Sequence, residues 1–261
     1  MVGAVVAVAV VEGVVTERGP GDSAGPASTA SSSPPPTTPT PAVPDPPSPT
    51  SSPMPSPAVD PPTAPNAPAP GSALEAALVL PVRNEDPWND YDRGLFGDAW
   101  TDVDHNGCDQ RNDILARDLV DVVFRAGTNG CVVHSGTLAD PYSGQTFGFL
   151  RGPDTSVLVQ IDHVVAIANA WRTGAQHWTT EQRVAFANDP LNLLAVDGEL
   201  NQAKSAGDAS EWLPPNPAFH CEYAARQTAV KTRHGLWFST PERDVVVGIL
   251  EGCPGQRLPV G

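Results

Sequence analysis

The sequence predicts an α+β fold in which a small sheet packs with several helices. Three observations indicate this class: helix-capping signals recur after residue 110, short β-branched segments alternate with them, and the residues before position 72 offer almost nothing to bury. The folded part therefore begins near Ser72 and comprises about 190 residues, which is enough for one sizeable core.

Composition divides the chain into three segments. Residues 1–19 are mostly apolar and are interpreted as a signal peptide or anchor, although the basic start of a signal peptide is missing. Residues 20–71 contain 19 of the 30 prolines and no aromatic residue, so they are predicted to be a disordered linker. This arrangement, followed by a folded domain over residues 72–261, predicts a secreted or surface-tethered extracellular protein without a stable membrane span in its mature form.

The acidic charge limits how the chain can interact with nucleic acid. The formal net charge is −15, and the part from Ser72 onward has 25 acidic against 14 basic residues, or −11. Sequence-independent affinity for nucleic acid comes from Lys and Arg side chains that neutralise phosphates. The composition therefore excludes a tight, stoichiometric DNA binder, but it allows a catalyst that contacts the backbone briefly through a bound cation.

Four cysteines lie in the folded part, at Cys108, Cys131, Cys221 and Cys253, and no two of them form a CxxC pair. In an exported chain, an even number without metal-ligand spacing predicts two disulfides. Three pairings are possible, and Cys108 with Cys131 and Cys221 with Cys253 is favoured because each pair brackets a predicted helix. Four free thiols in a cytosolic protein are the alternative.

The first predicted helix follows Asn112, a good N-cap for the segment DILARDLVDVVFRA, and ends at Gly127. The segments CVVHSG and QTFGFL predict a pair of strands that the turn DPYSG connects. The apolar segment VLVQIDHVVAI predicts a buried strand with Asp162 and His163 near its end. NLLAV, from Asn192, predicts a second short strand.

Helices account for the remaining patterns. Thr179 and Gln182 have the spacing of a capping box and predict a helix through Phe186. Further helices are predicted over residues 201–212, 217–235 and 241–250. The last of these begins with a second capping-box pair, Ser239 and Glu242.

Asp162 and His163 are the first candidate site residues. Adjacent side chains of a strand point to opposite faces, so the two can serve one site only at a strand end or a bulge. A polar pair in a buried strand is costly unless each member has a partner, and a pair satisfied by backbone groups in the core is the alternative. Asn192, at the start of the second strand, and Asn201, at the start of the next helix, favour a functional site. The order strand, strand, helix then presents a carboxylate, an imidazole and two amides.

These four residues resemble the site of the HNH superfamily of nucleases. From Tyr91 onward, the chain resembles the secreted bacterial HNH family related to the C-terminal domain of modification-dependent restriction enzymes of the GmrSD type (the DUF1524 group). The resemblance rests on the segments YDRGLFGDAW, NGCDQRNDILARDL, SGTLADPYSG, IDHVVAIANAWRTGA, FANDPLNLLAVDGELNQAKSAGDASEWLPPN and YAARQTAVKTRHGLW. It covers most of the chain after residue 90 and implies that residues 72–261 are an HNH-type nuclease domain with a ββα-metal (His-Me finger) core.

The resemblance also implies roles for individual residues. His163 matches the general base, Asp162 matches the first metal ligand, and Asn192 matches the residue that orients the base. Asn201 stands where the superfamily has its last histidine, a metal ligand. Because Asp162 and Asn201 offer oxygen donors, the expected cofactor is one Mg²⁺ or Mn²⁺ ion rather than Zn²⁺.

Phosphodiester cleavage needs an activated water, charge neutralisation in the transition state and help for the departing oxygen. With an ordinary pKa near 6.5, His163 would be roughly three-quarters neutral at pH 7, so activity is predicted to rise through about pH 6 to 7.

Lys204 lies one helical turn after Asn201 and is a candidate substrate-binding residue for a phosphate. A solvated surface lysine is the alternative.

A second candidate metal site lies earlier in the chain. The motif DxDxNG, with Asp113 where an EF-hand has its bidentate glutamate, is formed by Asp102, Asp104, Asn106 and Gly107. A structural Ca²⁺ site is therefore an alternative to a polar turn that a disulfide ties down.

Two functions from different classes are compatible with these patterns. The first is a monomeric, divalent-metal-dependent endonuclease that hydrolyses DNA, with RNA as a further substrate. The second is a catalytically silent, disulfide-stapled extracellular binding module on a proline-rich stalk. The acidic charge favours the second, whereas the complete set of four site residues favours the first.

Overall fold

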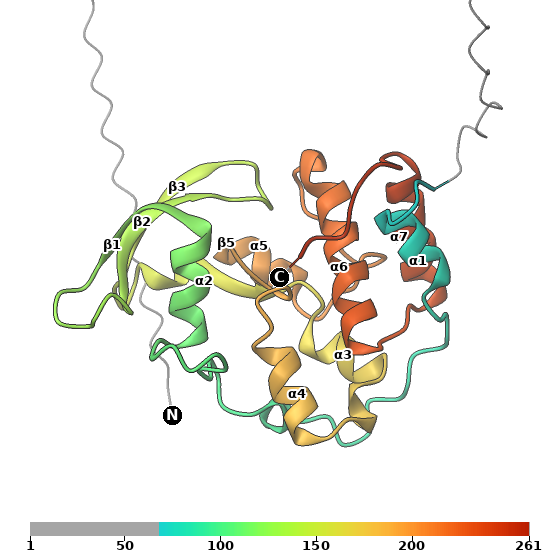
Figure 1. Ribbon diagram of the computed structural model, residues 1–261, viewed down its shortest axis with the longest axis horizontal. Helices are drawn as coiled ribbons and strands as arrows, with labels where there is room; N and C mark the ends of the chain where they lie inside the picture. The colour runs from blue at the N-terminus through green and yellow to red at the C-terminus, as the bar shows by residue number, and fades with distance from the viewer. Residues whose placement is uncertain (1–67, 261) are drawn as a thin grey trace, which may run out of the picture. The chain divides into compact units, whose positions relative to one another are not determined.

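The computed structural model describes residues 68–260, so the predicted apolar segment and nearly all of the predicted linker lie outside the described residues. The α-helices (α), 3₁₀ helices (η) and strands (β) follow one another as α1 (Ala73–Val79), η1 (Arg93–Phe96), α2 (Gln110–Asp118), β1 (Leu119–Phe124), β2 (Val133–Ala139), β3 (Thr146–Leu150), η2 (Ser156–Leu158), β4 (Val159–His163), α3 (Ile167–Arg172), η3 (Ala175–His177), α4 (Thr180–Ala187), β5 (Leu193–Asp197), α5 (Gly198–Lys204), η4 (Pro217–Phe219), α6 (His220–His234) and α7 (Thr240–Glu251) (Figure 1). The predicted α+β class is confirmed. Within residues 68–260, no helix is long and apolar enough to cross a membrane.

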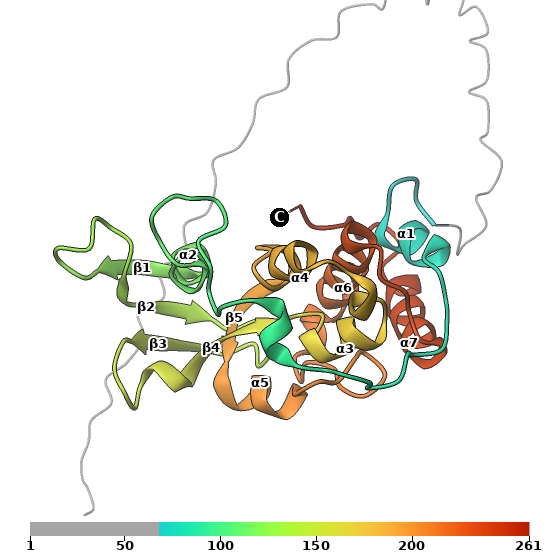
Figure 2. The ribbon, with the colours of Figure 1, turned by 90° about the horizontal axis from the view of Figure 1, so that it is seen from below.

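Two antiparallel sheets organise the domain. One has the strand order β1-β2-β3, and the other pairs β4 with β5. Figure 2 shows the pair β4–β5 between the three-stranded sheet on one side and the helices α3, α6 and α7 on the other. Helix α5 follows β5 without an intervening loop, so two strands and a helix meet where the candidate residues lie.

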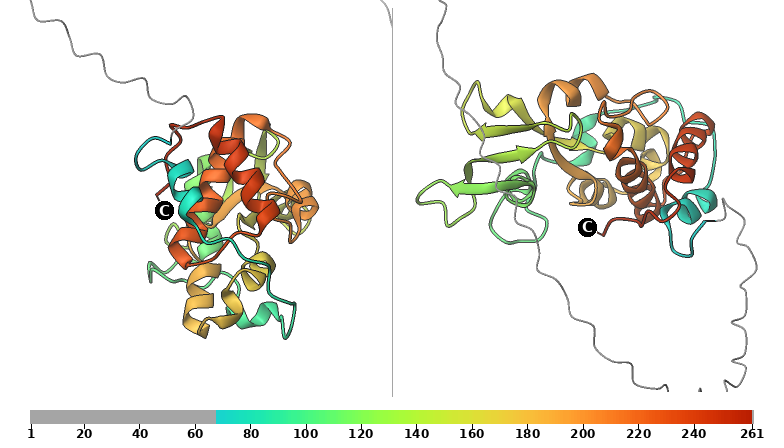
Figure 3. Two further views of the ribbon diagram at one scale, coloured as in Figure 1. Left: turned by 90° about the vertical axis from the view of Figure 1, so that its right-hand side faces the viewer. Right: turned by 90° about the horizontal axis from the view of Figure 1, so that it is seen from above.

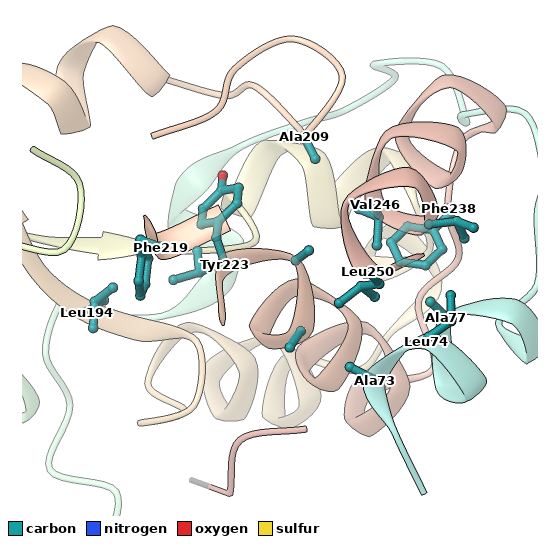
Figure 4. Packing of buried hydrophobic residues seen from close by; sticks show 14 of the residues in the cluster. Ala73, Leu74, Ala77, Leu194, Ala209, Phe219, Tyr223, Phe238, Val246 and Leu250 are labelled. Carbon is teal, nitrogen blue, oxygen red and sulfur yellow. The ribbon is translucent and has the colours of Figure 1, made fainter. Parts of the chain in front are cut away.

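Three apolar clusters hold these elements together. The largest lies between α1, α6, α7 and one face of β5, where Tyr223, Phe238 and Leu250 are fully buried (Figure 4). A second cluster joins η1, α3 and α4 around Trp171 and Phe186. The third fills the space between α2, the three-stranded sheet and the other face of β4–β5, and it includes Ile114, Leu138 and Ile161. The site strands are therefore packed on both faces, which makes their ends rigid.

Helices α6 and α7 also share a buried ion pair. The Lys231 ammonium donates to the Glu242 carboxylate at 2.7 Å and to the carbonyl of Trp237 at 3.0 Å, and both charged side chains are at most 1% exposed. Burial raises the pKa of Glu242 from 4.5 to about 7, while the Lys231 charge opposes this rise. The two views of Figure 3 show α6 and α7 side by side.

Several predicted helices are confirmed together with their ends. Both capping boxes are present, with Thr179 bonded to Gln182 at the start of α4 and Ser239 to Glu242 at the start of α7. Helix α6 ends at Gly235, whose φ of 67° lies in the left-handed region that favours glycine at this position.

The helix predicted from Asn112 to Gly127 is wrong in its second half. Helix α2 ends at Asp118, and the segment LVDVVF that follows is strand β1, paired with β2. The valines of this segment fit a strand as well as a helix, and the sheet edge offered by β2 decides between them. Asp109, and not Asn112, is the N-cap, while the Asn112 side chain accepts hydrogen bonds from the backbone of Val133 and from Arg151.

The helix predicted over residues 201–212 is also corrected. Helix α5 begins at Gly198, is capped by Asp197, and ends at Lys204. The chain then turns at Ser205, whose φ of 52° is incompatible with a continuing helix. The helix is therefore shorter and lies earlier in the chain, although it still contains Asn201.

Both disulfides of the favoured pairing are present. Cys108 and Cys131 join the loop before α2 to the residues just before β2, and Cys221 and Cys253 join the first turn of α6 to the residues after α7.

Candidate active site

The end of β4 places Asp162 and His163 at the boundary of the domain core. Their residues are 5% and 9% exposed, and both line a cavity of about 440 Å³ that Asn201 of α5 also lines. The strand ends at His163, so the two adjacent side chains reach the same cavity although they point to opposite faces of the strand. The structure thus brings three of the predicted residues together.

Asp162 is held by two buried donors. The hydroxyl of Tyr142 donates to Oδ2 at 2.5 Å, and the Lys204 ammonium donates to Oδ1 at 2.9 Å. Burial, followed by the nearby Asp162 charge, raises the pKa of Tyr142 well above its ordinary value, so this hydroxyl keeps its proton and remains a donor. The carboxylate is therefore fixed in position and keeps lone pairs for a further partner.

Lys204 was expected to contact a substrate phosphate, but its ammonium is bonded inside the domain. Its side chain is fully buried, and the ammonium donates to Asp162 and to the carbonyl oxygen of His163 at 2.8 Å. In this arrangement Lys204 balances the charge of Asp162 and orients the end of β4. Its position one turn after Asn201 follows from α5, which presents both side chains to β4.

His163 is held by a single hydrogen bond that fixes its tautomer. Nε2 lies 2.8 Å from the carbonyl oxygen of Ala187, and a carbonyl can only accept, so Nε2 carries the hydrogen. The neutral imidazole then has its lone pair on Nδ1. Burial lowers the pKa of His163 from 6.5 to about 4, more than the hydrogen bond to Ala187 raises it. The ring is a neutral base with one nitrogen left for proton transfer.

Asn192 is fully buried and acts on the chain just after His163. Its Oδ1 accepts from the backbone N–H of Val165 at 2.8 Å, and its Nδ2 donates to the carbonyl of the same residue at 3.2 Å. The backbone carbonyl of Asn192 also accepts from the N–H of Val164. The side chain makes no hydrogen bond to the imidazole, and it fixes the segment that follows the histidine.

Asn201 is oriented by Gln160, a neighbour of Asp162 on the same face of β4. Gln160 donates its amide to the carbonyl of Val157, so its Oε1 faces α5 and accepts from Asn201 Nδ2 at 2.8 Å. This bond leaves Oδ1 of Asn201 as the free end of the amide. The cavity is therefore lined by one carboxylate and one amide oxygen whose orientations the protein sets in advance.

Two residues beside His163 were not predicted. Trp100 lies with its ring plane at 17° to the imidazole and a centroid distance of 6.3 Å, and Arg93 lines the same cavity as Asp162. Tyr142, the donor to Asp162, was also missed. All three belong to segments that carry the resemblance, but none has a sequence spacing relative to Asp162 that indicates contact.

The DxDxNG loop uses its oxygens for internal hydrogen bonds. The Asp102 carboxylate accepts from the backbone N–H groups of Asn106 and Gly107, and Asn106 Nδ2 donates to Asp104 and Asp113. Across residues 68–260, no group of three or more His, Cys, Asp or Glu side chains is arranged to hold a metal ion. These internal hydrogen bonds close the loop, and the disulfide of Cys108 ties it to Cys131, ahead of β2.

The sequence profile of the C-terminal domain of GmrSD restriction endonucleases matches residues 109–245, which include β4, β5 and α5. The chain belongs to this family. One relative, an "Uncharacterized secreted protein" of Arthroderma benhamiae, is 34% identical over 176 residues, which are 67% of this chain and 81% of the relative. No solved structure gives a significant match. Membership of the family makes the chain nuclease-related, and the two disulfides together with the secreted relative support an extracellular location.

Proposed function

We propose that the protein is a divalent-metal-dependent endonuclease of the HNH type, with β4, β5 and α5 as its ββα-metal core. The observation that carries the proposal is the neutral His163 imidazole, which has Nδ1 free and lines one cavity with Asp162 and Asn201. A base beside two oriented oxygen donors is the arrangement that metal-assisted hydrolysis of a phosphodiester requires. The substrate is nucleic acid, with DNA as the first candidate.

The residues act in a simple sequence of steps. Nδ1 of His163 takes a proton from water, and the resulting hydroxide attacks phosphorus while the bond to the 3′-oxygen breaks. The 3′-oxygen leaves as an alkoxide and takes up a proton from solvent. The Ala187 carbonyl holds the ring and stabilises the imidazolium that forms. Asn192 keeps the backbone after His163 in place, so that the ring does not shift during the transfer.

The donor set fits a hard divalent ion. Asp162 and Asn201 supply one carboxylate and one amide oxygen, and Mg²⁺ and Mn²⁺ accept few protein ligands together with water and phosphate oxygens. Such an ion would neutralise charge on the phosphate and stabilise the leaving oxygen. The Lys204 charge on Asp162 opposes a second cation there, so binding of the ion alone should be weak and should strengthen with a phosphate present.

A plasmid-nicking assay tests the proposed function. Supercoiled DNA is incubated with the disulfide-bonded protein and Mg²⁺ or Mn²⁺, with an EDTA control. We expect nicks with either ion and none with EDTA. Failure to cleave DNA or RNA with any divalent ion would instead favour the silent extracellular module.

Metal removal should stop cleavage without unfolding the domain. Tyr142 and Lys204 already satisfy the Asp162 carboxylate, so the site does not need an ion to be stable. We therefore expect the melting temperature in EDTA to lie within about 2 °C of that in Mg²⁺, in contrast to a structural zinc domain. A large loss of stability in EDTA would place a structural ion somewhere in the protein.

The pH profile should extend to lower pH than an ordinary histidine allows. Because burial lowers the pKa of His163 to about 4, the imidazole is already neutral above about pH 5, and the base is lost only as pH falls through about 4. This revises the rise through pH 6 to 7 that the sequence predicts. The profile is measured as the initial rate of nicking at several pH values between 4 and 8, and circular dichroism verifies at each pH that the protein is folded. A midpoint near pH 6.5 would contradict the buried base.

A further inference from the structure

A second cavity, of about 260 Å³, lies beside the candidate active site, and His163 lines both cavities. Its walls are largely apolar, with contributions from Phe96, Trp100 and Ile167. The volume is close to the lower limit of small-ligand cavities, about 300 Å³. A compact apolar cavity continuous with a phosphodiester-cleaving site has the size and chemistry of a subsite for one unit of the polymer.

Trp100 is fixed at the wall of this second cavity in an unusual backbone conformation. Its φ is 62°, in the left-handed region that bulky residues rarely adopt. Residues held in such conformations concentrate at functional sites, where the surrounding structure maintains them. The backbone thus presents an indole ring beside His163, and indole is a surface on which any nucleobase can stack.

Arg93 is the cation that the two cavities share. Among the described residues, no other lysine or arginine lines either cavity, and Arg93 forms no ion pair there. The carboxylate of its neighbour Asp92 accepts from the N–H of Gly94 at 2.8 Å as the cap of η1, and Asp98, which also lines the second cavity, forms no ion pair with Arg93. Arg93 is exposed, and its charge at the junction of the cavities is not neutralised by an ion pair.

Other basic residues near the site are already used. Lys204 pairs with Asp162, and Arg172 pairs with Glu85. In a domain with a net charge of −11, an arginine outside any ion pair, between a largely apolar cavity and the cavity of Asp162 and Asn201, favours an anionic ligand at this position.

We propose that the second cavity binds one nucleoside of an unpaired nucleic-acid strand, stacked on Trp100, and that Arg93 holds the phosphate between this nucleoside and the cleavage site. The inference rests on the proposed function and names its substrate class. A nucleoside in a duplex must leave its stack and its partner before it can enter such a cavity, which costs free energy that a single strand does not lose. Single-stranded nucleic acid is therefore the preferred ligand.

Binding without cleavage tests the inference separately from catalysis. The wild-type protein in EDTA is titrated into a short fluorescein-labelled single-stranded oligonucleotide at low salt, and anisotropy gives Kd. We expect Arg93→Gln and Trp100→Ala each to raise Kd about tenfold, and Trp100→Phe to stay close to wild type because it keeps an aromatic face. Arg93→Gln should also reduce the slope of log Kd against log salt by about 0.7, the value for one phosphate contact on a single strand.

Arg125→Gln is the matched control, because Arg125 is exposed at the end of β1 and lines neither cavity. It should leave Kd and the salt slope close to wild type. The inference is overturned if Arg93→Gln behaves like Arg125→Gln, or if the duplex of the same sequence binds as tightly as the single strand. Should Trp100→Ala not fold, Arg93→Gln and the duplex comparison still decide. A wild-type protein that binds single strands through Arg93 but cleaves nothing with any metal would contradict the proposed function alone.

Discussion

Replacement of His163 by alanine should lower the rate of DNA nicking by about 10²- to 10⁴-fold, the usual contribution of a general base. The imidazole is the group beside Asp162 that has a free basic nitrogen, and Nε2 is already used by the Ala187 carbonyl. Single-turnover nicking with Mg²⁺ measures the loss. Cleavage that survives the change would remove His163 from the mechanism.

Two further variants separate chemistry from folding in this experiment. His163→Gln keeps an amide that can donate to the Ala187 carbonyl but has no basic nitrogen, so it should be folded and as inactive as His163→Ala. His134→Ala is the matched control, because His134 is exposed on β2 and lines neither cavity of the site. It should nick DNA at the wild-type rate.

At pH 8, Lys231→Met should destabilise the protein by about 3–5 kcal/mol, because it leaves the buried Glu242 carboxylate without its cation. Urea unfolding monitored by tryptophan fluorescence measures this change. The double variant Lys231→Met/Glu242→Met should recover most of the loss, since two apolar side chains of similar volume can replace a buried pair. A double variant as unstable as the single one would show that the cost arises from packing rather than from the unpaired charge.

The loss in Lys231→Met should depend on pH in a defined direction. The pKa of Glu242 is raised from 4.5 to about 7 in the wild type by burial, and removal of Lys231 takes away an interaction that lowers it. A carboxyl group whose pKa is raised by folding stabilises the folded state fully below about pH 4.5. This stabilisation is lost as the pH rises through the pKa of the folded state. The difference between variant and wild type should therefore be larger at pH 8 than at pH 5.

The sequence predicts helix ends better than it predicts where a helix gives way to a strand. Thr179 with Gln182 and Ser239 with Glu242 were recognisable because a capping box is a local interaction, complete within four residues. The boundary between α2 and β1 was missed because the valines after Asp118 become a strand only through pairing with β2, more than ten residues away. That pairing is tertiary information, which local spacing does not contain.

Some residues of the candidate site could also be predicted from the sequence, and others could not. The placement of Asp162, His163 and Asn201 around one cavity was predictable because they lie on adjacent elements and because the chain resembles a known family. The contacts of Tyr142 and Arg93 depend on loops that are distant in the sequence and lie against the end of β4. No local sequence pattern predicts these contacts. The hydrogen-bond partner of the Lys204 ammonium could not be predicted either. A lysine at helical spacing has the same sequence pattern whether its side chain points to solvent or to a buried aspartate.

The disulfide between Cys221 and Cys253 affects how long the protein survives outside a cell. The loop that it closes contains both Lys231 and Glu242, so the start of α6 and the end of α7 stay joined when the two helices separate transiently. Extracellular proteases cut chains that open locally, and a cross-link that closes a loop of about thirty residues reduces the population of such open states. We therefore expect this covalent bond to lengthen the half-life of the protein under protease attack.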